Sequence, residues 1–239
     1  TGSSSLRGAE DGRERGCLQV IPKIIHQIWL GDQTKRPNEL LNSWKEKNPT
    51  WQYKLWTEKN LPMLRCQQQF DTVECQVGKA DILRYEVLLN EGGFYIDADS
   101  KCLEPLDDFF VDNDSFCCWE NEYARTGLMA NGFLGATKNN VLIKDLVDGI
   151  ERMDSQVIKE ITEYTCWQVL GPQYLTDRVT TIPYTKIRIY PSHYFLPQYY
   201  LKWMPRYEGS EKVYSDHYYF STYKTSHIEE DFMGPVGSP

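Results

Sequence analysis

The stretch that most constrains the fold is Lys79–Asp99, which reads KADILRYEVLLNEGGFYIDAD. Residues 80–90 are mainly strong helix formers without Gly or Pro, and they predict a helix of about three turns. Gly92 and Gly93 follow, and glycine can adopt the left-handed conformation that ends a helix. Residues 94–96 have strand propensity. The stretch therefore predicts a helix, a glycine turn and a strand in direct succession.

Two aspartates, Asp97 and Asp99, stand at the end of this predicted strand. Side chains two residues apart on a strand point to the same face, so we expect the two carboxylates side by side. Such a pair repels unless one carboxyl is protonated or a cation lies between them. Carboxylate oxygens suit Mg²⁺, Mn²⁺ or Ca²⁺. The pair therefore indicates a metal-binding site.

The predicted helix adds two further charges, Asp81 and Arg84, which are three residues apart and share one helical face. One interpretation is a surface salt bridge, which is worth roughly 0–1 kcal/mol. The alternative is that both side chains line the same cleft as the aspartates. Arg84 could then bind an anionic or hydroxyl-rich ligand with its forked guanidinium. The spacing leaves both interpretations open.

Strand and helix patterns alternate before this stretch. Residues 22–30, PKIIHQIWL, form an apolar run typical of a buried parallel strand, and residues 51–56, WQYKLW, alternate as a second strand does. We expect an amphipathic helix over Pro37–Asn48 and a partly helical segment over Leu61–Gln76. This order is typical of a nucleotide-binding α/β half, which binds ligands at the carboxyl ends of its strands. Trp29 stands at such an end, where its ring could stack on a nucleotide base. The alternative is that Trp29 packs in the core.

The second half of the chain continues the alternation. We expect strands over Ser115–Trp119, Gly127–Ala136 and Lys186–Tyr190, and an amphipathic helix over Val141–Met153. The glycines of the second of these strands let a ligand or another backbone approach closely. Gly171, which precedes a proline, is interpreted mainly as a loop or helix-start residue.

The run ADILRYEVLLNEGGFYIDAD resembles the signature of glycosyltransferase family 32, A-D-x-x-R-Y followed by L-x-x-x-G-G-x-Y-x-D-x-D. That family and its relatives include yeast outer-chain mannosyltransferases, α-1,4-glycosyltransferases and the glucosylating domains of clostridial toxins. The resemblance is strong over residues 79–105, fair over 21–31 and loose after 130, and it ends near Thr225. It implies an α/β, GT-A-like (Rossmann-like) nucleotide-sugar-binding fold with a mostly parallel central sheet flanked by helices.

The resemblance also implies a catalytic centre and a metal site. Asp97, Asp99 and Arg84 take the catalytic positions, and Asp97, Asp99 and His217 would hold Mn²⁺ or Mg²⁺. Family members often carry a histidine in this C-terminal segment, followed by Ser-Trp. Here Tyr223 replaces that tryptophan, which puts its role as a lid in doubt. For His217 the alternative is a structural role.

Further residues correspond to the family's donor-binding positions. Trp29 and Leu30 would contact the base of the donor. Tyr95 would orient the ribose or Asp97, and Asp81 with Arg84 would hold sugar hydroxyls. Asn131 would line the sugar pocket, and a turn-forming Asn before Gly132 is the alternative. The full donor-binding set is Trp29, Leu30, Asp81, Arg84, Tyr95, Asp97 and Asn131. His26, in contrast, is interpreted as a core histidine.

These features predict a metal-dependent, retaining glycosyltransferase that moves a hexose from a UDP- or GDP-linked sugar to a glycan, protein or lipid acceptor. Retention is implied by the resemblance alone. Two alternatives stay open. One is a nucleotide-sugar hydrolase on the same fold. The other is a non-catalytic sugar-binding module that uses aromatic side chains and Ca²⁺.

Composition bounds the remaining choices. The 239 residues suffice for one sizeable domain, which we expect over residues 20–228 with tails at 1–19 and 229–239. The net charge of −8 argues against a nucleic-acid-binding surface, which would be basic. No apolar run approaches the ~20 residues that span a membrane. Seven cysteines without a Cys-x-x-Cys pair indicate reduced thiols and a cytoplasmic location, with the Golgi or secretory lumen as the alternative if an N-terminal anchor has been removed.

Overall fold

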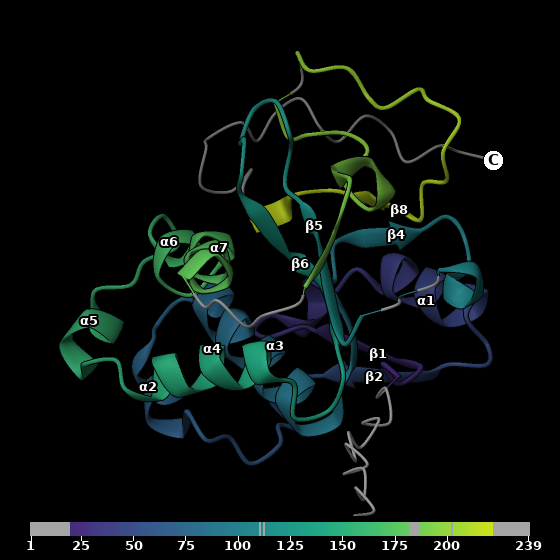
Figure 1. Cartoon of the computed structure of the whole chain (residues 1–239). Coiled ribbons are helices and arrows are strands. Elements are labelled where there is room, and N and C mark those ends of the chain that lie inside the picture. The colour runs from purple at the N-terminus through teal and green to yellow at the C-terminus, as the bar shows by residue number, and fades with distance from the viewer. Residues whose placement is uncertain (1–19, 110, 112, 182–186, 202, 222–239) are drawn as a thin grey trace, which may run out of the picture.

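A six-stranded sheet runs through the middle of the molecule (Figure 1), in the order β2-β1-β3-β6-β5-β7. The structure is a computed structural model that describes residues 20–109, 111, 113–181, 187–201 and 203–221. The strands are β1 (Ile24–Ile28), β2 (Gln52–Trp56), β3 (Gly93–Ile96), β5 (Ser115–Trp119), β6 (Met129–Ala136) and β7 (Arg188–Tyr190).

Five of these six strands run in one direction. β1 pairs in parallel with β2 and β3, and β5 pairs in parallel with β7. β6 is antiparallel to both of its neighbours, β3 and β5. The predicted α/β fold with a mostly parallel sheet is therefore confirmed. Because β1, β3 and β5 share a direction, their carboxyl ends lie at one edge of the sheet.

Helices cover both faces of the sheet (Figure 1). On one face lie α1 (Asn38–Lys47) and a small sheet of β4 (Ser100–Cys102) and β8 (Ser215–His217). The other face is covered mainly by α3 (Gln76–Glu91) and α4 (Val141–Glu151). The remaining helices are α2 (Gln67–Thr72), α5 (Ser155–Lys159), α6 (Cys166–Val169), α7 (Pro172–Thr181) and the short 3₁₀ helices η1 (Gln33–Lys35), η2 (Leu106–Asp108) and η3 (Ser192–Tyr194).

Each face of the sheet has its own apolar core. The first core joins α3 and α4 through side chains such as Leu83 and Leu146. The second core joins α1 to the other face through Trp44, whose indole N–H donates to the carbonyl oxygen of Ser100 at 3.1 Å. Phe195 also lies in this second core. The two cores hold the central strands from both sides, so the sheet edge is a rigid platform.

The predicted helix–turn–strand succession is confirmed, with a longer helix. α3 begins at Gln76 rather than near residue 80, and it ends at Gly92, which has φ +68°. A β-carbon at Gly92 would lie 2.6 Å from the backbone nitrogen of Lys138, so the position requires glycine for space as well as for conformation. Gly171 directly precedes α7, as predicted.

Some predictions fall outside the described residues. These are the two tails, the lid position Tyr223, the start of the predicted strand at Lys186, and Cys17. The six cysteines that the structure describes are all free thiols, in agreement with the prediction. Among the described helices, none has both the length and the apolar composition to cross a membrane.

Candidate active site

The candidate site lies where the chain leaves β3 and turns toward β4. The sequence predicted that the two aspartates lie on the strand, and this prediction is wrong. β3 ends at Ile96, and residues 97–99 form the turn. The backbone N–H of Asp97 donates to the carbonyl oxygen of Gly132 on β6 at 2.9 Å. The side-chain amide of Gln27 donates to the carbonyl oxygen of Asp97 at 3.2 Å. Neighbouring strands thus hold the turn in place.

Gly132 makes room for the first aspartate. A β-carbon at this position would lie 2.2 Å from Oδ2 of Asp97, so only glycine leaves space for the carboxylate. Asn131, the residue before it, lies inside β6 and is buried. The alternative of a turn-forming asparagine is therefore wrong. The close approach predicted from the glycines of this strand is confirmed, and the group that approaches is a site carboxylate.

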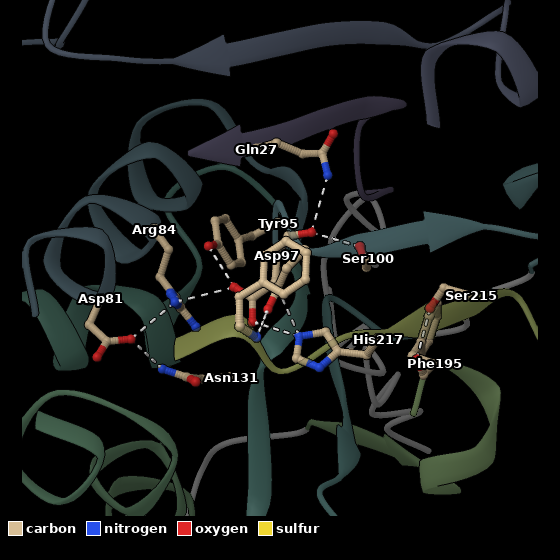
Figure 2. A network of polar contacts seen from close by, with 12 residues as sticks. Gln27, Asp81, Arg84, Tyr95, Asp97, Ser100, Asn131, Phe195, Ser215 and His217 are labelled. Carbon is tan, nitrogen blue, oxygen red and sulfur yellow. Dashed lines mark hydrogen bonds and ion pairs between the residues drawn. The ribbon is translucent and has the colours of Figure 1, made fainter. Parts of the chain in front are cut away.

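A buried ion-pair network connects the helix to the turn (Figure 2). Nη2 of Arg84 lies 3.1 Å from Oδ1 of Asp81 and 3.4 Å from Oδ1 of Asp97. Asp81 is 3% exposed and Arg84 is 4% exposed, so the interpretation as a surface salt bridge is wrong. Nε and Nη1 of Arg84 are buried without a hydrogen-bond partner among the described residues. These two nitrogens are donors that a bound ligand could satisfy.

Two neutral side chains orient the acids of this network (Figure 2). The hydroxyl of Tyr95 donates to Oδ1 of Asp97 at 2.8 Å, and its ring lies 4.4 Å below the guanidinium carbon of Arg84. The side-chain amide of Asn131 donates to Oδ1 of Asp81 at 2.9 Å. The structure therefore brings these predicted site residues together with Asp97.

His217 completes a candidate metal site. β8 pairs with β4, and this register sets His217 opposite Ser100, next to the aspartate turn. Nε2 of His217 lies 3.2 Å from Oδ1 of Asp99 and 3.4 Å from Oδ2 of Asp97. One ligand atom from each of the three residues lies within 4.8 Å of the others. Both ring nitrogens are buried and make no well-aligned hydrogen bond, so the imidazole is available to coordinate a cation.

The charged groups of this cluster shift one another's pKa values. Burial alone would raise the pKa of Asp97, but Arg84 and His217 hold it well below its usual range. Burial alone would lower the pKa of His217, but Asp99 and Asp97 raise it to about 10. A protonated imidazole therefore separates the two carboxylates. A divalent cation could take over this neutralising role.

Trp29 and Leu30 lie at the same sheet edge, directly after β1. The indole N–H of Trp29 donates to the carbonyl oxygen of Asp32 at 3.1 Å, and the side chain is partly exposed. Leu30 packs partly buried against the first core. Their base-binding role stays a prediction.

His26 is a core histidine, as predicted. Its Nε2 is 2.8 Å from the carbonyl oxygen of Gly92, and the indole N–H of Trp56 donates to Nδ1 at 3.1 Å. The sequence reasoning missed Gln27, which supports the turn through the backbone of Asp97. Its signal was a polar residue inside an apolar strand, a position that needs a hydrogen-bond partner.

A mostly parallel α/β sheet whose edge carries an Asp-x-Asp turn beside a buried arginine defines a GT-A-like glycosyltransferase fold. Residues 34–116 match the family described as "Glycosyltransferase sugar-binding region containing DXD motif", and this segment contains Asp97 and Asp99. Over these residues the chain is similar to that glycosyltransferase family. A solved structure, "PaToxG Glycosyltransferase", shares the fold with a TM-score of 0.56 and 20% identity over 68% of this chain and 70% of that chain.

Curated relatives include enzymes of Schizosaccharomyces pombe. Inositol phosphoceramide mannosyltransferase 3 is 26% identical over 146 residues, which cover 56% of this chain and 38% of the relative. Inositol phosphoceramide mannosyltransferase 1 is 23% identical over 198 residues, which cover 77% of this chain and 60% of the relative. The chain thus spans between about two fifths and three fifths of the length of these relatives.

Proposed function

We propose that this protein transfers a hexose from a nucleotide-diphosphate sugar to a hydroxyl group of a glycan, protein or lipid acceptor, with the help of a divalent cation. The observation that carries the proposal is the convergence of Asp97, Asp99 and His217, whose ligand atoms lie within 4.8 Å of one another beside the buried Arg84. The match of residues 34–116 to the DXD family supports the same conclusion.

The side chains fit a cation that accepts both oxygen and imidazole ligands. Asp97, Asp99 and His217 would hold it; the two carboxylates suit Mg²⁺ or Mn²⁺, and the imidazole favours Mn²⁺ over the harder Mg²⁺. When bound, the cation would neutralise the charge that develops on the diphosphate leaving group. The unpartnered ring nitrogens of His217 support this assignment, because a buried polar atom without a partner is unusual in a native protein.

The α3 side chains would hold the transferred sugar. Arg84 has two buried donors without partners, and sugar hydroxyls can accept hydrogen bonds from both. Asp81 is kept in place by Arg84 and Asn131, so its carboxylate can accept from a hydroxyl. Tyr95 fixes the orientation of Asp97 through its hydroxyl. The network is formed before ligand arrives, which reduces the cost of ordering the site on binding.

The base end of the donor would lie against Trp29 and Leu30 at the carboxyl end of β1. Several relatives are named mannosyltransferases, so GDP-linked mannose is the first donor to test, followed by the UDP-linked hexoses. Retention of the anomeric configuration follows from the family resemblance.

A thermal-shift panel of GDP- and UDP-sugars, each with and without Mn²⁺, tests the proposal. A ligand at about 100 times its dissociation constant stabilises the folded state by about 2.7 kcal/mol. We expect a metal-dependent shift with one nucleotide class in the wild type and in the control Asp71→Asn, whose side chain is exposed. The double variant Asp97→Asn, Asp99→Asn should lose that shift. Full transfer activity of the double variant after chelator treatment would refute the proposal.

A mass balance then separates transfer from hydrolysis. Free sugar and glycosylated acceptor are quantified against the donor consumed. Sugar released in equal amount to the nucleotide, with no acceptor product across a panel of glycans, lipids and proteins, would make the protein a nucleotide-sugar hydrolase. A shift with free glycans and Ca²⁺ but with no nucleotide would indicate a binding module.

A further inference from the structure

The sheet edge that carries Asp97 carries a second polar group, which the donor site leaves unused. Glu120 directly follows β5, as Asp97 directly follows β3, and the two strands run in the same direction. β6 lies between them, and strands are spaced by about 4.8 Å, so the two chain exits are about 10 Å apart. A molecule bound at Glu120 would therefore lie beside the donor site without overlapping the metal ligands.

The carboxylate of Glu120 is held from one side only. The hydroxyl of Tyr199 lies 3.4 Å from Oε1 of Glu120, and Nε of Arg125 donates to the same hydroxyl oxygen at 3.2 Å. Arg125 balances the charge of the acid and stacks over the ring of Trp167 at 4.9 Å. Within the described part of the chain, no donor reaches Oε2 of Glu120. This oxygen is free to accept a hydrogen bond from a ligand.

Tyr219 connects this group to the metal site. Its ring lies 4.3 Å from the ring of His217 and 6.1 Å from the ring of Tyr199. The residue is 7% exposed, and its hydroxyl has no hydrogen-bond partner among the described residues. Its backbone has φ +53°, a conformation that is strained for a bulky residue and that collects at ligand-binding sites. A strained residue with a buried, unpartnered hydroxyl indicates a missing ligand.

We propose that Glu120 and Tyr219 form the acceptor subsite, and that it takes an uncharged polyol ring, either a sugar or a cyclitol. Glu120 accepts a hydrogen bond from a ring hydroxyl, and the hydroxyl of Tyr219 donates to another ring oxygen. A carboxylate at the centre disfavours an anionic group there.

This inference rests on the proposed function and gives Glu120 a positioning role. The acceptor oxygen forms the new bond to the anomeric carbon while the bond from that carbon to the diphosphate oxygen breaks. The proton of the acceptor hydroxyl leaves with the departing diphosphate. Glu120 and Tyr219 orient the acceptor for this step, and neither needs to gain or lose a proton over the reaction.

Two-substrate kinetics of Glu120→Gln and Tyr219→Phe test the subsite. The acceptor probes are methyl α-mannoside, methyl β-galactoside and myo-inositol, with the donor identified by the thermal-shift panel. We expect each variant to raise the acceptor KM by about tenfold, the effect of losing one hydrogen bond to a well-placed partner. The donor KM and the release of free sugar without acceptor should change by less than about twofold.

Two matched controls separate this role from a general effect on the fold. Glu163→Gln and Tyr123→Phe make the same chemical changes at exposed side chains, and they should leave both KM values at the wild-type level. Unchanged acceptor KM in Glu120→Gln and Tyr219→Phe would overturn the subsite, and so would an equal rise of both KM values. Failure of the wild type to use or bind any of the three polyol probes would also overturn it.

The outcomes distinguish the subsite from the proposed function. A wild type that shows no metal-dependent nucleotide-sugar shift and no sugar release contradicts the proposed function, and the subsite falls with it. A wild type that binds and hydrolyses the donor, with variants that leave the acceptor KM unchanged, refutes the subsite alone.

Discussion

The two halves of the site are built in different ways. The helix–strand half, residues 76–97, contains Asp81, Arg84, Tyr95 and Asp97, which pair with one another in the buried interior. The β8 half, residues 215–220, contributes short backbone pairing to β4 and a histidine with no well-aligned hydrogen bond. The first half therefore holds its side chains in place through pairs with one another, while the second half contributes polar groups that are available to bind a ligand.

The difference has a physical reason. A buried ion pair is stable only when each charge has a partner, so the helix–strand half must be nearly complete without ligand. A metal ligand and a substrate-binding hydroxyl must instead keep their polar atoms available. We therefore expect substitutions in the helix–strand half to act mainly on the stability of the fold, and substitutions in the β8 half to act mainly on ligand affinity.

Arg84→Met should have the largest effect on stability, because it leaves the carboxylate of Asp81 buried without its cation and removes one of the two cations beside Asp97. Removal of one partner from a buried ion pair costs about 3–5 kcal/mol. The control is Arg65→Met, which breaks exposed pairs and should cost no more than about 1 kcal/mol. Urea denaturation gives both values. A loss below about 1 kcal/mol for Arg84→Met would contradict the rigid helix–strand half.

Gly132→Ala should damage the link between the halves. The added β-carbon would collide with Oδ2 of Asp97, the oxygen that faces His217, so the carboxylate has to move. Overpacking of this kind costs about 1–3 kcal/mol. We also expect weaker binding of Mn²⁺, measured by isothermal titration calorimetry. Wild-type Mn²⁺ affinity in this variant would show that the Asp97 carboxylate is not a metal ligand.

His217→Gln should separate the two halves most clearly. The variant removes an imidazole from the candidate metal site, and we expect Mn²⁺ affinity to fall by about 10- to 100-fold. The free energy of unfolding without metal should also fall, because the protonated imidazole lies between the carboxylates of Asp97 and Asp99 and separates their charges. A large loss of stability with unchanged Mn²⁺ affinity would reverse the assignment and make His217 structural.

His26, which contacts the carbonyl oxygen of Gly92 within the helix–strand half, offers a smaller test. Burial lowers its pKa below 6.5, and both ring nitrogens are engaged in the neutral form. The unfolded chain therefore binds the extra proton more readily, so stability contributed by His26 is present above pH 6.5 and is lost as the pH falls. The slope is at most about 1.4 kcal/mol per pH unit. Thermal unfolding between pH 5 and pH 7.5 should show this slope in the wild type and a flatter one in His26→Gln.

Much of the helix–strand half could be predicted because its determinants are close in the chain. Helix formers, two glycines and three strand formers specify α3, the turn at Gly92 and β3. The expectation that Asp97 and Asp99 lie together was right in outcome and wrong in mechanism. A strand would have set their spacing, but the chain turns at residue 97, and contacts from β6 and β8 set it instead.

The β8 half could not be predicted in the same way. A three-residue strand carries no periodic signal of its own, and a lone histidine is compatible with many roles. Only the family resemblance pointed to His217, and it did not point to Glu120 or Tyr219. The polar residue Glu120 after a predicted strand was a usable signal, because it follows the same rule that placed Trp29 at a carboxyl end.

Local propensity and spacing determined the class of fold, the helix and strand that carry the Asp-x-Asp turn, and the chemistry of a cation site, because these depend on residues within a few turns of one another. Only the tertiary structure decided which groups meet. The pairing of β8 with β4, the space over Gly132 and the approach of His217 to Asp97 join segments far apart in the chain. Such contacts arise when strands pair and the two cores close, and no periodicity along the chain encodes them.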